Sequence, residues 1–228
     1  MKIFVIPGHG AGDPGACGNG YHEAERVRKL AQCVKDLGGD NVILADFKRN
    51  YYEDKGISNL TLPKDTQIVE LHMDSYSNPS ARGAHVIISD KYNPDAYDKA
   101  LARDMSQLFP GRSESISKRG NLANVNRAAA KGYGYRLIEC GFITNAHDIK
   151  VFNDNIEGIA KIILKCFGIP CEEKVSEDKP KVSEQIAANM KTIQAALNSL
   201  KKLKVSNEIS KEIKNMQTAI DRVKKLNG

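Results

Sequence analysis

The sequence has little that would place it in a membrane or on a secretory route. No apolar run in its 228 residues approaches the roughly 20 residues that a membrane-spanning helix needs. The N-terminus leads from Met1-Lys2 directly into a short strand-like run, without the pattern of a signal peptide. We therefore expect a protein made in the cytoplasm that carries no membrane segment and does not act at a membrane.

Cysteine is also too sparse and too irregularly spaced for a disulfide scaffold. The five cysteines are an odd number and include no CxxC pair. Cys33 falls on the apolar face of a predicted helix and Cys140 in a predicted strand, so we interpret both as buried thiols.

Bulk composition fits a soluble globular chain, with 41% hydrophobic and 27% charged residues. The net charge is +6, and residues 172–228 contribute twelve Lys/Arg against eight Asp/Glu. A basic appendage fits an anionic partner such as nucleic acid, a membrane or a wall polymer, and it fits simple solubility equally well. We expect no nucleic-acid partner.

Residues 1–171 alternate between strand-like and helix-like patterns, which predicts a three-layer α/β/α domain with a mostly parallel, twisted sheet. Asn93 and Pro94 are predicted as the N-cap and first residue of one helix, which Pro110 closes. One long final helix is predicted from about residue 145 to 164, and the segment with Arg112 and Arg119 is predicted as a loop. The predicted strands are 2–6, 41–46, 66–72, 84–89 and 135–140, and the other predicted helices are 23–37 and a short one around Ala128.

Composition changes after Cys171. Residues 172–182 are short, charged and contain a proline, which indicates a linker. Residues 183–228 carry two heptad-patterned segments separated by residues 205–207, which predicts a helical hairpin. Pairing of two hairpins into a four-helix bundle would bury both apolar stripes, so we favour a homodimer. The alternative is a hairpin folded onto the first domain.

Polar residues stand where predicted strands end or helices begin: His9, Glu23, His72 and Glu139. In open α/β sheets, ligands bind beyond the carboxyl ends of the strands, so these four can meet at one rim. Two imidazoles and one carboxylate are a recurrent ligand set for catalytic zinc, and a further carboxylate suits proton transfer. A phosphate site is disfavoured, because the glycine-rich loop after residue 7 fits neither GxGxxG nor the P-loop and contains the acidic Asp13.

Three motifs in order resemble the zinc-dependent N-acetylmuramoyl-L-alanine amidases, the amidase type 3 family. The resemblance covers roughly residues 1–168. It implies zinc held by His9, Glu23 and His72, with Glu139 as the general base, in hydrolysis of the amide between N-acetylmuramic acid and L-alanine of peptidoglycan. The motifs are Gly8-His-Gly10 with Asp13-Pro-Gly-Ala16 and Gly20-Tyr-His-Glu-Ala-Glu25, then Glu70-Leu-His-Met-Asp-Ser75, then Leu137-Ile-Glu-Cys-Gly-Phe-Ile-Thr-Asn145 followed by Asp148.

The chain departs from the family pattern at Asp74, where the family commonly has asparagine, and this concerns local substrate contacts. Glu25 is an alternative ligand to Glu23, although the helical phase set by Leu30 and Ala31 favours Glu23. His22 and His147 are interpreted as non-ligands. Candidate substrate-binding residues are Arg119, which could assist the oxyanion, with Asp74, Asn145 and His85.

Without a signal peptide, a phage endolysin is the leading functional hypothesis, released from the host cytoplasm to act at the bacterial cell wall. The resemblance then implies that residues 183–228 are a cell-wall-binding or dimerisation module. The alternatives are a bacterial autolysin of the same chemistry, a zinc peptidase or deacetylase, and a wall-binding module that has lost catalysis. The intact set of His9, Glu23, His72 and Glu139 argues against the last of these.

Overall fold

The computed structural model describes residues 1–10, 12–171, 182–201 and 207–226, with side chains in the last two ranges described for 189–201 and 209–221. The chain divides into two compact units, residues 1–174 and 175–228. Most of the predicted linker lies outside the described residues. Of the described helices, none combines the length and hydropathy that a bilayer-spanning helix needs.

The first unit is built on a six-stranded sheet with the strand order β4-β1-β5-β8-β6-β7. Strands β4, β1, β5 and β8 run parallel to one another, and β6 runs antiparallel to β8 and parallel to β7. The mostly parallel sheet predicted from the sequence is therefore confirmed. The strands are β1 (Ile3–Pro7), β4 (Val42–Leu44), β5 (Gln67–Asp74), β6 (His85–Ser89), β7 (Ile116–Arg119) and β8 (Tyr135–Phe142), and a separate two-stranded hairpin pairs β2 (Cys17–Gly18) with β3 (Tyr21–His22).

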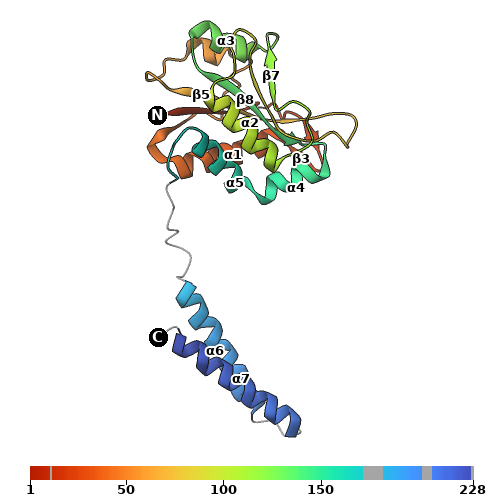
Figure 1. Cartoon of the computed structure of the whole chain (residues 1–228), viewed down its shortest axis with the longest axis vertical. Coiled ribbons are helices and arrows are strands. Elements are labelled where there is room, and N and C mark those ends of the chain that lie inside the picture. The colour runs from red at the N-terminus through yellow and green to blue at the C-terminus, as the bar shows by residue number, and fades with distance from the viewer. Residues whose placement is uncertain (11, 172–181, 202–206, 227–228) are drawn as a thin grey trace. The chain divides into compact units, whose positions relative to one another are not determined.

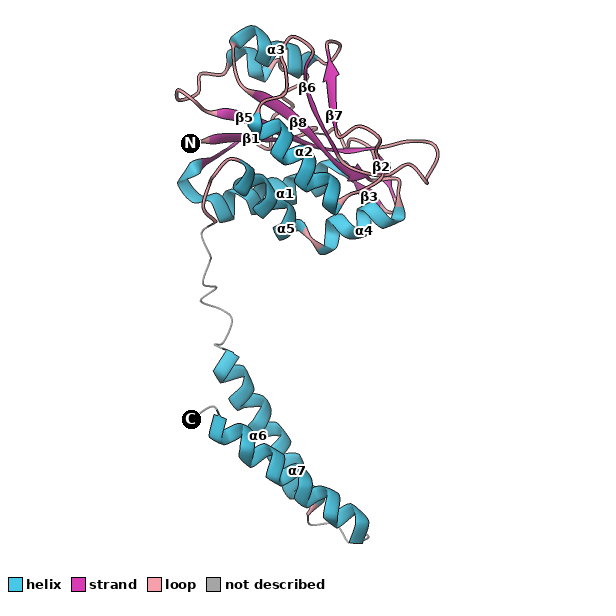
Figure 2. Cartoon of the chain, viewed as in Figure 1, coloured by secondary structure: helices cyan, strands magenta, loops and turns pink. Residues whose placement is uncertain are grey.

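Helices cover both faces of this sheet, which gives the three predicted layers (Figures 1 and 2). On one face, α1, α2, α4 and α5 pack on the larger apolar core, which includes Val27, Leu101 and Ile159. On the other face, α3 and the 3-10 turn η2 (Gly56–Asn59) pack on a smaller core that includes Val125 and Ile57. The helices are α1 (Glu23–Gly38), α2 (Ala96–Leu108), α3 (Ala123–Lys131), α4 (Ala146–Asp154) and α5 (Ile156–Cys166), with a 3-10 turn η1 (Gly39–Asn41) after α1.

Several local predictions were wrong. Helix α2 begins at Ala96, because Asp95 and Asp98 form a reciprocal capping box that starts the helix after Asn93 and Pro94. The single final helix is broken at Asn155 into α4 and α5. The predicted loop around Arg119 contains the edge strand β7, and β5 continues past His72 to Asp74.

Cysteine forms no disulfide among the described residues, which include all five positions. Cys140 is fully buried, as predicted, whereas Cys33 is only half-buried.

The second unit consists of two helices, α6 (Val182–Leu200) and α7 (Asn207–Leu226), as the heptad pattern predicts. They pack against each other through Leu197, Ile213 and Ile220. Gln194 and Gln217 exchange hydrogen bonds of 2.8 and 2.9 Å across the same interface, which fixes one register between the two helices.

Candidate metal centre and active site

Strand register brings three of the predicted site residues to one rim of the sheet. His9 lies two residues beyond the end of β1, which is the parallel neighbour of β5. His72 on β5 is paired with Glu139 on β8, and Glu139 is paired in turn with His85 on β6. Directly opposite residues point to the same face of a sheet, so His72 on β5 and His85 on β6 flank Glu139 on the strand between them.

The loop after β1 holds His9 in a sterically demanding position. His9 has φ +63°, a left-handed conformation that non-glycine residues rarely adopt. Gly8 lies so close to the His72 ring that a Cβ there would come within 2.3 Å of it. Gly15 has φ +67°, and a Cβ there would come within 2.6 Å of His9 and 2.8 Å of Glu23. The glycines are therefore needed for this loop to close around the two imidazoles, with the local strain typical of functional sites.

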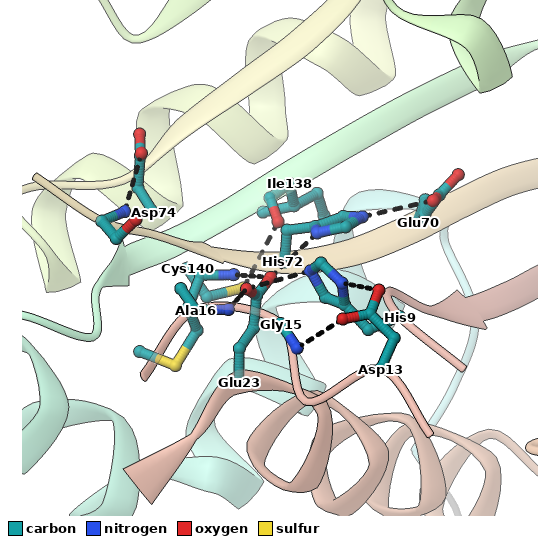
Figure 3. Close-up of polar contacts among 12 residues, drawn as sticks. His9, Asp13, Gly15, Ala16, Glu23, Glu70, His72, Asp74, Ile138 and Cys140 are labelled. Carbon is teal, nitrogen blue, oxygen red and sulfur yellow. Dashed lines mark hydrogen bonds and ion pairs between the residues drawn. The ribbon is translucent and has the colours of Figure 1, made fainter. Parts of the chain in front are cut away.

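Glu23, the first residue of α1, places its buried carboxylate between the two imidazoles (Figure 3). One oxygen lies 3.0 Å from His9 Nε2 and the other 2.9 Å from His72 Nδ1. The backbone N–H groups of Ala16 and Met73 donate to the same two oxygens at 2.9 and 3.0 Å. These bonds fix the carboxylate in one orientation between the rings.

The second nitrogen of each imidazole contacts a second carboxylate. His9 Nδ1 lies 2.8 Å from Asp13 Oδ2, and His72 Nε2 lies 3.2 Å from Glu70 Oε1. Glu70 is itself buried and accepts hydrogen bonds from Tyr135 Oη at 2.6 Å and from Asn124 Nδ2 at 3.1 Å. Such outer carboxylates fix the tautomer and orientation of metal-binding histidines.

The electrostatics of the cluster follow from these contacts. Burial alone would raise the pKa of Glu23, but the hydrogen bonds from His72 and His9 outweigh it and leave that pKa far below its usual range. Burial opposes charge on both imidazoles as well, yet Glu23 raises the pKa of His9, and Glu23 with Glu70 raises that of His72. The site therefore strongly favours a positive charge between His9, Glu23 and His72.

The three residues fit a tetrahedral zinc ion. The ligand atoms of His9, Glu23 and His72 all lie within 4.8 Å of one another. Zinc at about 2.0–2.1 Å from each ligand would separate tetrahedral ligands by about 3.3 Å. Glu23 Oε2 lies 3.0 Å from His9 Nε2 and Glu23 Oε1 lies 2.9 Å from His72 Nδ1, so each ring nitrogen has a carboxylate oxygen near that separation. Three protein ligands leave a fourth position for water or substrate, as in catalytic zinc sites.

Glu139 lies beside this triad with properties suited to proton transfer. Its Oε2 is buried and has no hydrogen-bond partner among the described residues. Burial raises the pKa of Glu139 to about 8; nearby His72 opposes the shift, and Asp74 and Glu23 reinforce it. A carboxyl group with a pKa near neutrality can both accept and donate a proton at physiological pH.

Beyond Glu139, Asp74, His85 and Glu139 form a second cluster within 4.8 Å. Here the positive charge is already supplied by the protein, because Arg112 Nη2 donates to Asp74 Oδ2. His85 Nε2 is buried and has no hydrogen-bond partner in the part of the chain that the structure describes, and it lies 3.8 Å from Asp74 Oδ2. Burial, with the charges of Arg112 and Arg119, lowers the pKa of His85 to about 4, so this imidazole is neutral at pH 7.

The other predicted residues are placed as follows. Glu25 is exposed, 3.8 Å from Arg26, and does not reach the imidazoles, whereas Glu23 does. Asn145 caps α4 by accepting from the backbone of His147 and Asp148. Arg119 is exposed at the end of β7 and bonds to Asn121. His22 contacts Cys17 and His147 contacts Arg82, both away from the triad.

Sequence reasoning missed four polar residues that support the site: Glu70, Asn124, Tyr135 and Arg112. For Glu70 a signal was available, since a residue two positions before His72 in a strand points to the same side. The others come from distant segments, and no local pattern marks them.

An open α/β sheet with two imidazoles and one carboxylate at the carboxyl ends of its strands has the architecture of a metal-dependent hydrolase. The chain belongs to the Amidase_3 family, N-acetylmuramoyl-L-alanine amidase, whose profile matches residues 3–166. Members of this family are generally zinc-dependent.

Two kinds of relatives accompany this match. The chain is 32% identical over 181 residues to "Probable autolysin PH" of Staphylococcus aureus, covering 71% of this chain but only 37% of that protein. It resembles the N-acetylmuramyl-L-alanine amidase Ami1 of Mycobacterium smegmatis, with a TM-score of 0.60 and 20% identity over 74% of this chain and 95% of that one. It also resembles the catalytic domain of the CD27L endolysin targeting Clostridia Difficile, with a TM-score of 0.59 and 23% identity over 73% and 96% of the two chains. These structural likenesses establish the fold.

Proposed function

We propose that the chain hydrolyses the amide between the lactyl group of N-acetylmuramic acid and L-alanine in peptidoglycan, with zinc as its metal. The observation that carries the proposal is Glu23, held between His9 and His72 with all three ligand atoms within 4.8 Å, in a chain of the amidase family. The adjacent Glu139 supplies the acid–base group that amide hydrolysis needs.

His9 Nε2, Glu23 and His72 Nδ1 would hold the metal, which when bound polarises a carbonyl and lowers the pKa of a water molecule toward 7. Asp13 and Glu70 keep the two imidazoles oriented with the correct nitrogen inward. Glu139 takes a proton from the attacking water and delivers it to the leaving amine of L-alanine. In the metal-free protein, burial raises the pKa of Glu139 to about 8, which supports a role as a group that accepts and then donates a proton.

The test is to identify the bond that is cut. Purified peptidoglycan is digested with the zinc-loaded protein and the soluble products are analysed by mass spectrometry and N-terminal labelling. The proposal predicts new L-alanine amino termini and glycan strands with free lactyl carboxylates. New peptide termini at other residues would indicate a zinc peptidase, and release of acetate would indicate a deacetylase; either would contradict the proposal.

We further propose the phage endolysin as the biological setting, with the bacterial autolysin as the alternative. Both use the same chemistry, and the relatives include a probable autolysin and the catalytic domain of an endolysin. Localisation in growing, intact cells of the natural host separates them. An autolysin is found in the cell wall, whereas an endolysin stays in the cytoplasm until a holin is expressed.

A role for residues 183–228 follows from their surface. Ile193, Leu200 and Met216 are large apolar side chains that are 40–49% exposed, although Leu197 and Ile213 already close the hairpin interior. We propose that a second copy of the hairpin covers this stripe in a four-helix bundle. A cell-wall ligand is the alternative occupant.

A further inference from the structure

A groove beside Glu139 is lined by charged side chains that have no role in the proposed hydrolytic step. It has a volume of about 400 Å³ and is lined by Arg82, His85, Arg112, Ser117 and Phe142, with the exposed Glu114 at its edge. Neither metal-binding imidazole lines it. A separate cavity of about 290 Å³ borders His9 and His72 and shares no lining residue with this groove.

The direction of the reaction determines which part of the substrate enters the groove. This step rests on the proposed function, in which Glu139 protonates the amine that leaves. From β5 through β8 to β6, the sheet presents His72, then Glu139, then His85. The scissile carbonyl is therefore bound on the β5 side, its nitrogen faces Glu139 on β8, and the peptide that begins with this nitrogen continues toward β6 and the groove.

Two guanidinium groups stand along that direction. Arg112 is fixed by its bond to Asp74, by Nε donating to Gly83 O at 3.3 Å, and by stacking 4.7 Å above the Phe142 ring. Arg82 Nε is buried without a hydrogen-bond partner among the described residues, 3.7 Å from Asp148 Oδ1, and Arg82 Nη2 contacts His147 Nδ1 at 3.1 Å. Both arginines line the groove, and their side chains remain 24% (Arg112) and 34% (Arg82) exposed.

His85 adds an unpartnered polar atom at the inner end of the groove. The residue is only 6% exposed, its Nδ1 lies 3.4 Å from Ser117 Oγ, and no described residue forms a hydrogen bond with its Nε2. A buried polar atom without a partner is costly, and a ligand that supplies the missing hydrogen bond removes that cost. The position, between Glu139 and the two arginines, is where the first peptide group after the scissile amide would lie.

We propose that this groove binds the stem peptide through a free carboxylate on the residue that follows L-alanine, held by Arg82 and Arg112. A carboxylate on this residue would lie one to two extended residues, about 3.5–7 Å, beyond the amine at Glu139. Guanidinium groups bind carboxylates through two parallel hydrogen bonds, so a carboxylate is recognised in preference to the neutral carboxamide of the same shape. The groove thereby makes the enzyme selective for the charge state of the second stem residue.

The experiment is a competition between two substrates in one reaction with the full-length, zinc-loaded chain. The substrates are disaccharide-peptides that differ only in whether the D-glutamyl residue after L-alanine carries a free α-carboxylate or a carboxamide. The ratio of the two products gives the ratio of kcat/KM directly. We expect about a tenfold preference for the carboxylate, reduced to less than about threefold in Arg82→Gln and partly retained in Arg82→Lys.

A matched control removes one positive charge elsewhere on the same unit. Arg103 on α2 has a side chain that is 62% exposed and pairs with Asp104, so Arg103→Gln is expected to keep the tenfold preference. Arg112→Lys tests the second guanidinium while retaining the charge beside Asp74. A wild-type ratio near one, an unchanged ratio in Arg82→Gln, or an equal loss in Arg103→Gln would overturn the proposal. Failure to cut either substrate at the amide would instead contradict the proposed function.

Discussion

At the scale of single residues, Glu139 is the position where a role in catalysis can be tested separately from metal binding. It lies outside the set of His9, Glu23 and His72, and its buried Oε2 has no hydrogen-bond partner within the described ranges. We expect Glu139→Gln to reduce amide hydrolysis by about 10³-fold while the zinc content stays at one ion per chain. Rate assays and elemental analysis measure the two effects. The exposed Glu25→Gln is the control, and near-normal activity or loss of zinc in Glu139→Gln would refute the assigned role.

Glu70 is expected to act on zinc affinity through His72. Glutamine at this position keeps the shape but removes the negative charge beside His72 Nε2, so the imidazole is a weaker donor and is less firmly oriented. We expect Glu70→Gln to bind zinc about 10- to 100-fold more weakly in competition with a chelator. The absorption spectrum of the cobalt-substituted protein should shift as well, because His72 is no longer held in one orientation. Unchanged affinity and spectrum would show that Glu70 serves packing only.

His85 is expected to make the metal-free first unit sensitive to acid. Its folded pKa of about 4 lies below the usual value, so the folded state binds fewer protons than the unfolded state, and stability is lost as pH falls from about 6.5 to 4. Asp74 from β5, Glu139 from β8, Arg112 and Arg119 face this imidazole. In chelator-treated protein, the free energy of unfolding should fall between pH 7.5 and 4.5 by about 2 kcal/mol less in His85→Gln than in wild type.

Tyrosine fluorescence is suited to this measurement. The chain has no tryptophan, and all eight tyrosines lie between residues 21 and 135, so urea unfolding followed by this signal reports on the first unit alone. An equal loss of stability in both proteins would show that other groups are responsible for the acid sensitivity.

At the scale of elements, Asn145 links a helix terminus to the rim of the active site. Its Oδ1 accepts from two backbone N–H groups at the start of α4, and its Nδ2 donates to Pro79 O at 2.7 Å. We expect Asn145→Ala to destabilise the first unit by about 1–2 kcal/mol with little change in KM. Urea unfolding and steady-state kinetics test both parts. A raised KM with unchanged stability would favour the substrate-binding role expected from the sequence.

The elements that sequence reasoning found are those with strong apolar periodicity. Strands β1, β5 and β8 are almost continuous runs of buried residues, as expected for strands covered on both faces. Strand β7, with the sequence Ile-Ser-Lys-Arg, has one large apolar residue and lies at the sheet edge, so no alternation marked it. The break at Asn155 was missed for the opposite reason, since the apolar residues continue at helical spacing through it.

At the scale of the whole molecule, the candidate site could be predicted because its chemistry is carried by few residue types at strand ends. His9, Glu23, His72 and Glu139 were nominated from position and residue type, and the fold brings all four together. The supporting residues could not be nominated in the same way. Arg112 meets Asp74 and Tyr135 meets Glu70 only through strand order and loop packing, and one sequence does not specify those contacts.

The last prediction concerns the association of chains through α6 and α7. Ile193 and Leu200 lie on the same apolar side of α6 as Leu197, but only Leu197 is buried against α7, whereas Ile193 and Leu200 remain 49% and 40% exposed. If a second hairpin covers them, Ile193→Glu with Leu200→Glu places two charges in a buried interface and should convert a dimer into a monomer by light scattering. Lys191→Glu, an exposed change on the other side of α6, should leave the dimer intact. Truncation after Cys171 should also give a monomer. A dimeric truncation would place the interface on the first unit, and a monomeric wild-type chain would leave the stripe to a cell-wall ligand.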